Sequence, residues 1–230
     1  SLTIMAAYEY GKASHRSTIK ITSALCALWC TCLSAIILLS VKYKFPFDII
    51  AQPVTGVQIV AGILVTVHIL SLAVSSALER DHFRIKPKNV FKCVIAVVCA
   101  CIVFHVLAIL FGAPALESSR ETFHFAMLLT GVTVLPACCV LGADGEKWIA
   151  VYAQSRPELG KETVIYITTI TSVVGAWLGA VPLPLDWDRP WQVWPVSCVL
   201  GSLFGYCLGL LLSALYLPLK HRQLYKTKLT

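Results

Sequence analysis

Charged residues are scarce in this sequence of 230 residues, and no polar segment is long enough to fold by itself. Asp, Glu, Lys and Arg make up 13% of the chain, whereas soluble proteins carry roughly 25%. Apolar residues make up 57%, and they recur in stretches of about 20, the length that crosses a bilayer. These shortages exclude an ordinary soluble domain. The sequence predicts a polytopic membrane protein.

Motifs for chemistry are missing as well. The sequence has no nucleophile elbow, no phosphate-binding glycine loop and no Asp-rich phosphotransferase motif. Its ten cysteines all fall in apolar segments without paired spacing, so we expect them to pack inside helices rather than to bind zinc or form disulfides. We therefore predict no catalytic residue, no metal site and no cofactor.

Six apolar runs predict an all-α bundle of six transmembrane helices. The expected spans are 18–41, 56–78, 90–111, 122–141, 163–183 and 195–217. The first run is too long for the core of a signal peptide, so we expect it to be an uncleaved span. Residues 18–217 then form one membrane domain, between an N-terminal tail (1–17) and a basic C-terminal tail (218–230).

Lysine and arginine are distributed unevenly between the two sides of this bundle. Of the 19, only Lys42, Lys44, Arg120 and Arg189 fall on the side opposite the termini. Cytoplasmic loops retain Lys and Arg, so both termini are expected in the cytoplasm. The segment between the fifth and sixth spans should then lie on the other side, which is the lumen in a eukaryotic secretory membrane. The net charge of +7 reflects this topology and contact with anionic lipids rather than nucleic-acid binding.

Small residues recur every four positions in the last two spans. They are Gly175 and Gly179 in the fifth, and Gly201, Gly205, Gly209 and Ser213 in the sixth. This spacing lines one face of a helix and lets backbones approach closely. Two interpretations stay open: the fifth and sixth helices pack on each other, or the glycine face receives a helix from another protein.

The segment LGAVPLPLDWDRPWQVWP (178–195) gathers aromatic and polar residues between two apolar spans. Its candidate contact residues are Asp186, Trp187, Asp188, Arg189, Trp191 and Trp194. Tryptophan favours the membrane interface, proline ends helices, and either aspartate could pair with Arg189, so a purely structural turn is one interpretation. Because Trp and Arg dominate protein interfaces, docking of a partner on the lumenal side is another. Contact with lipid headgroups or glycans is a third.

Two histidines, His105 and His124, fall near the lumenal ends of their spans. An ionisable group at membrane depth is a functional candidate, and both could face a vestibule that they share with the Trp-rich segment. The alternative is a packing role, because a neutral imidazole can both donate and accept a hydrogen bond inside a helix bundle.

The stretch ITSVVGAWLGAVPLPLDWDRPWQVWPVSCVLGSLFGY (170–206) closely resembles the C-terminal signature of the PIG-F family. FHVLAILFGAP (104–114), ETFHFAMLL (121–129) and VLPACCVLG (134–142) are similar to that family too. The resemblance covers about the C-terminal 60% of the chain, and the first two spans carry no comparable motif.

The resemblance implies a non-catalytic subunit of glycosylphosphatidylinositol (GPI) anchor biosynthesis in the endoplasmic reticulum. Members of this family stabilise multi-span enzymes that transfer ethanolamine phosphate from phosphatidylethanolamine to GPI mannoses. The implied partners are a PIG-O-like enzyme, acting on the third mannose, and a PIG-G-like enzyme, acting on the second, each bound separately. Handling of phosphatidylethanolamine or of the GPI precursor by the bundle itself is the alternative.

Overall fold

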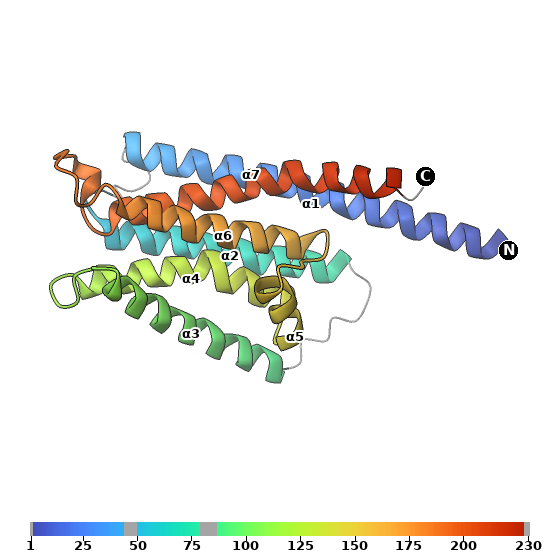
Figure 1. Ribbon diagram of the computed structural model, residues 1–230, viewed down its shortest axis with the longest axis horizontal. Helices are drawn as coiled ribbons and strands as arrows, with labels where there is room; N and C mark the ends of the chain where they lie inside the picture. Colours follow the sequence, from blue (N-terminus) through green and yellow to red (C-terminus); the bar gives the residue numbers. More distant parts are fainter. Residues whose placement is uncertain (1, 44–49, 79–86, 228–230) are drawn as a thin grey trace.

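The computed structural model describes residues 2–43, 50–78 and 87–227, and within these ranges it contains helices and turns but no strand (Figure 1). The α-helices are α1 (Leu2–Tyr43), α2 (Pro53–Leu78), α3 (Pro87–Leu110), α4 (Ser119–Leu141), α5 (Gly145–Trp148), α6 (Lys161–Ala180) and α7 (Val196–Thr227). A short π-helix, η1 (Ile149–Ala153), continues α5, and a single 3-10 turn, η2 (Pro190–Gln192), precedes α7.

Six of these helices are long and apolar enough to cross a membrane, as the sequence predicts. The spans are Ser17–Tyr43, Pro53–Leu70, Lys88–Leu110, Ser119–Leu141, Lys161–Ala180 and Val196–Leu224. The predicted fifth span (163–183) runs past the end of α6, because the chain turns at Val181, whose N–H donates to the carbonyl of Leu178 at 3.2 Å.

The two expected tails are largely helical. From Leu2 onward the segment predicted as an N-terminal tail belongs to α1, and α7 continues through Pro218 to Thr227. Residues 2–17 contain no proline and only one glycine, Gly11, so nothing in this segment stops the helix from extending beyond its apolar part.

Glycines end two of the helices by adopting a left-handed backbone. Gly112 (φ 99°) follows α3, and its N–H donates to the carbonyl of Ile109 while the N–H of Ala113 donates to that of Ala108. This is the Schellman arrangement, which satisfies carbonyls left free at a helix end. Gly142 (φ 64°) ends α4 in a similar way, donating to Cys138 at 3.0 Å.

The bundle is built around α4, α6 and α7. Helix α6 packs along α7 and also contacts α4, while α1 packs on α7 and α2 on α4. The main core contains Leu33, Leu64, Leu128 and Leu203, one from each of α1, α2, α4 and α7. Helix α3 packs against α4 at the edge of the bundle, and none of its membrane-spanning residues is buried. It is the peripheral helix.

A smaller core holds the segment between α4 and α6. Val151 of η1 is fully buried with Ala137 and Leu141 of α4 and Ile165 of α6. The sequence predicts only a polar linker here. The apolar residues are too few to give a periodic signal, although Asp144 marks the start of α5 by accepting from the backbone N–H groups of Glu146 and Lys147.

The two ends of the bundle carry different features. The chain termini and α5 lie at one end, and the crossing between α6 and α7 lies at the other, beside the turn between α3 and α4 (Figure 1). The separation matches the two sides assigned from lysine and arginine. That the end with the termini faces the cytoplasm stays a prediction.

Candidate functional site

The interface between α6 and α7 is formed by glycines that meet backbone to backbone. A methyl group on Gly179 would lie 2.5 Å from the carbonyl oxygen of Ser197, and one on Gly201 would lie 3.0 Å from the Cα of Gly179. One on Gly175 would lie 3.1 Å from the Cα of Gly205. These separations are below the roughly 3.5–4.0 Å of favourable contact between carbon atoms, so only glycine fits at these positions.

The same contact continues along α7. A methyl group on Gly205 would lie 2.8 Å from the carbonyl carbon of Thr171, and one on Gly209 would lie 2.8 Å from the Cα of Thr168. Ser213, the last small residue of the series, is buried and donates to the carbonyl of Gly209 in its own helix at 2.7 Å. The chain therefore uses these glycines to join its own helices, which leaves no room on these faces for a helix from another protein.

The crossing between α6 and α7, residues 181–195, is fixed to the bundle through Trp194. Its indole N–H donates to the Thr122 hydroxyl at 3.1 Å, and its ring meets the edge of the Phe125 ring with centroids 5.4 Å apart. Thr122 and Phe125 are buried in the first turns of α4. Of the predicted contact residues, Trp194 thus faces inward, where it holds the crossing against α4.

Gln192, which is not among the predicted contact residues, holds the crossing in shape. Its amide Nε2 donates to the carbonyls of Pro182, at 2.6 Å, and Leu185. Its Oε1 accepts from the N–H of Arg189 at 3.3 Å, and its own backbone N–H donates to the carbonyl of Arg189 at 2.9 Å, which closes η2. The available signal was the spacing from Arg189 to Gln192, since a glutamine at the third helical position often accepts from the N–H of the residue that precedes the helix.

Four predicted contact residues lie on the outside of this crossing. Asp186, Trp187, Asp188 and Arg189 are all exposed, and the ring of Trp187 meets that of half-buried Trp191 at 6.2 Å. Among the described residues, neither aspartate forms an ion pair with Arg189, the pairing that a purely structural turn could have used. The Gln192 side chain already bonds to backbone groups of this turn. The charges of the two aspartates and of Arg189 are therefore available to solvent or to a partner.

The two predicted histidines are brought together by Phe123. The ring of His105 lies 6.2 Å from that of Phe123, and the ring of His124 lies 5.8 Å from it. His124 Nδ1 donates to the carbonyl of Arg120 at 2.7 Å, because a carbonyl can only accept, and Nε2 lies 2.9 Å from the side-chain nitrogen of Gln58. His124 is thus part of a contact between α2 and α4.

The described residues contain no group of three or more His, Cys, Asp or Glu side chains that could hold a metal ion. The arrangement defines a six-helix membrane protein. Its polar and aromatic edge is the exposed side of the short crossing at one end of the bundle, residues 181–195, which is held together by its own hydrogen bonds. Such an edge can bind a protein or a lipid headgroup.

Comparison with known proteins gives the family. The model of the GPI biosynthesis protein family Pig-F matches residues 13–214. The chain is 40% identical over 181 residues to the human "GPI ethanolamine phosphate transferase, stabilizing subunit", covering 77% of this chain and 83% of that protein. A "Glycosylphosphatidylinositol anchor biosynthesis protein 11" from Yarrowia lipolytica is 39% identical over 124 residues, 54% of this chain and 53% of that protein. No solved structure matches. The chain belongs to the PIG-F family.

Proposed function

We propose that this chain is a non-catalytic subunit that binds and stabilises a GPI ethanolamine phosphate transferase in the membrane of the endoplasmic reticulum. The observation that carries the proposal is the 40% identity to a human stabilising subunit over 83% of that protein's length. The catalytic partners are enzymes of the PIG-O and PIG-G types. Both termini face the cytoplasm in this proposal, and residues 181–195 face the lumen, where ethanolamine phosphate is transferred.

The outside of the crossing is the proposed contact with the catalytic partner. It offers an indole, two carboxylates and a guanidinium on a backbone that is already ordered by Gln192 and Trp194. A preordered surface loses little conformational entropy on binding, and Trp and Arg are the residues that contribute most at interfaces. The glycines of α6 and α7 support this contact indirectly by setting the spacing of the two helices that carry it.

The proposal is tested in cells that lack their own PIG-F protein. Expression of this chain should restore the level of the catalytic subunit and of GPI-anchored proteins at the cell surface, and the two chains should co-purify in mild detergent. The chain purified alone should show no transfer of ethanolamine phosphate. If expression leaves the catalytic subunit at its depleted level, or if the chain alone is active, the proposal is wrong.

The alternative, a lipid-handling subunit, is favoured by the exposed guanidinium of Arg189, which forms no ion pair with any other described residue. Arg189→Ala separates the two functions, with Arg120→Ala, which is also exposed, as the matched control. Loss of co-purification in Arg189→Ala alone supports a partner contact. Normal assembly with reduced transfer supports contact with a phosphate of phosphatidylethanolamine or of the GPI precursor.

A further inference from the structure

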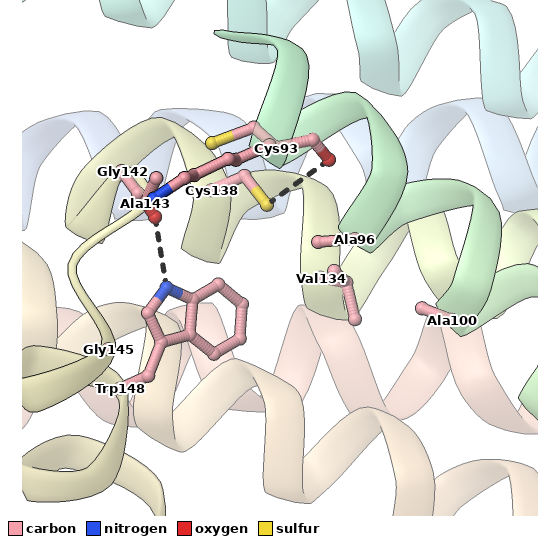
Figure 2. A pocket seen from close by; sticks show the side chains of 10 residues that line it. Cys93, Ala96, Ala100, Val134, Cys138, Gly142, Ala143, Gly145 and Trp148 are labelled. Atoms are coloured by element: carbon pink, nitrogen blue, oxygen red, sulfur yellow. Dashed lines mark hydrogen bonds between the residues drawn. The ribbon is translucent and has the colours of Figure 1, made fainter. Parts of the chain in front are cut away.

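A cavity of about 410 Å³ lies between α3 and α4 at the end of the bundle that carries α5. Its inner walls are small and apolar, formed by Ala96 and Ala100 of α3 and Val134 of α4 (Figure 2). Across its floor the Cys138 thiol of α4 approaches the carbonyl of Cys93 in α3 at 3.9 Å. The cavity is thus placed between the peripheral helix and the centre of the bundle.

On the side away from α3, the segment of α5 and η1 is held by the rest of the bundle. The smaller core joins this segment to α4 and α6 through Val151 and Ile165. Trp148 is fixed there, since its indole N–H donates to the Gly142 carbonyl at 3.0 Å and its ring lies 5.6 Å from that of Tyr152. Tyr152 in turn bonds to the Thr169 hydroxyl of α6 at 3.2 Å. These contacts hold the Trp148 ring at the wall of the cavity.

The cavity lining has one charged side chain at one end and mostly small apolar side chains along the rest. Lys92 is its one charged member, and it has no ion-pair partner within the described residues. The side chains of Ala96, Ala100 and Val134 offer no hydrogen bond, and a water molecule needs two to four polar partners to be held in a cavity. The apolar part therefore fits a hydrocarbon chain, and the end at Lys92 fits an anion.

From this geometry we propose that the cavity binds one anionic glycerophospholipid, with an acyl chain between α3 and α4 and the headgroup phosphate at Lys92. Tryptophan at the rim is typical of the headgroup level of a bilayer, and basic pockets between membrane helices bind anionic headgroups. The ligand chemistry is a phosphate joined to an acyl chain, at the end of the bundle opposite the crossing. The inference does not depend on the proposed function.

The test uses the full chain in nanodiscs of phosphatidylcholine that contain a minor fraction of phosphatidylserine, followed by extraction and native mass spectrometry. The wild-type chain should retain one phospholipid, enriched in phosphatidylserine. Ala96→Phe fills the cavity and should abolish retention. Val98→Phe, on the same helix but exposed to 54%, is the matched control and should retain the lipid.

Lys92→Gln tests the headgroup contact, with Lys88→Gln as the control, since Lys88 is exposed at the same end of α3 but does not line the cavity. Lys92→Gln alone should lower the enrichment in phosphatidylserine about fivefold. Should Ala96→Phe fail to give a monodisperse chain, Ala100→Leu is the second cavity-filling variant. A wild-type chain without lipid, a free fatty acid in its place, or full retention by a well-folded cavity variant would overturn the inference.

Discussion

The indole N–H of Trp194 donates to the hydroxyl of Thr122 at 3.1 Å, although the two residues are 72 positions apart in the chain. This bond joins the crossing before α7 to the first turn of α4. The Thr122 hydroxyl also bonds the carbonyl of Ser118 at 2.9 Å, so its position is set by its own helix. The depth and orientation of the crossing are therefore fixed by the start of α4.

Trp194→Phe should destabilise the chain by about 1 kcal/mol, the usual contribution of one hydrogen bond, beyond the loss of aromatic contact area. Thr122→Val removes the same bond from the other side, so the double variant should be less destabilised than the sum of the two single ones. Thermal unfolding in detergent, followed by size-exclusion chromatography, measures the effect. Strict additivity would show that the bond contributes nothing to stability.

Gly205→Ala should destabilise the chain by roughly 1–3 kcal/mol, because the new methyl group would press on the backbone of Thr171 and force α6 and α7 apart. Gly131→Ala is the matched control: Gly131 is also buried in a membrane helix, but no atom lies within 4 Å of its added methyl group. Melting temperatures of the two variants test the difference. Equal melting temperatures would contradict the close packing described for α6 and α7.

Gln192→Glu should disorder the crossing while leaving the helices folded. A carboxylate cannot donate to the carbonyls of Pro182 and Leu185, and the three oxygens would repel one another. Gln154→Glu is the control, because Gln154 is exposed directly after η1, far from the crossing. Limited proteolysis should show faster cleavage within 182–193 for Gln192→Glu only, with little change in the melting temperature. Equal protection of the two variants would exclude the bracing role of Gln192.

The six helices could be predicted because a membrane span requires a long run of apolar residues, and that requirement is visible in composition alone. Their packing could be predicted only in part. Glycines four residues apart, such as Gly201 and Gly205, indicate a close helix contact, but the spacing does not say which helix makes it. The structure supplies α6 as the neighbour.

The candidate site was less accessible to sequence reasoning. The tryptophans of the crossing all look alike as interface residues, yet Trp194 is half-buried and packs against Phe125, while Trp187 is 54% exposed. The difference depends on contacts with α4. These contacts join residues that are far apart in the chain, such as Trp194 and Thr122, and no local pattern indicates them. Gln192 was missed for the same kind of reason, because its role comes from carbonyls that only the folded turn brings within reach.

Trp187→Ala should weaken association with the catalytic partner without changing the stability of the chain. Trp187 lies on the exposed side of the crossing and contacts only the edge of Trp191 among the aromatic residues described. Trp177→Ala, at a position of similar exposure (61%) within the α6 span, is the matched control. Co-purification in mild detergent should fall several-fold for Trp187→Ala, the range seen when an interface tryptophan is truncated. Equal recovery of the partner with both variants would place the contact elsewhere on the bundle.

The orientation of the bundle can be tested with single introduced cysteines. Asp188→Cys places a thiol on the crossing, and Gln154→Cys places one at the opposite end; both positions are exposed. The chain's own ten cysteines all lie in the apolar helices, so the mass shift of each variant is compared with that of the parent chain. In cells with only the plasma membrane permeabilised, a membrane-impermeant maleimide should label Gln154→Cys, and should label Asp188→Cys only after the internal membranes are opened.

The reason for this expected labelling is the excess of Lys and Arg at the end of the bundle that carries the termini, since basic loops are retained in the cytoplasm. Labelling of Asp188→Cys from the cytoplasmic side would place the crossing away from the lumenal reaction and would remove the proposed contact with the catalytic partner.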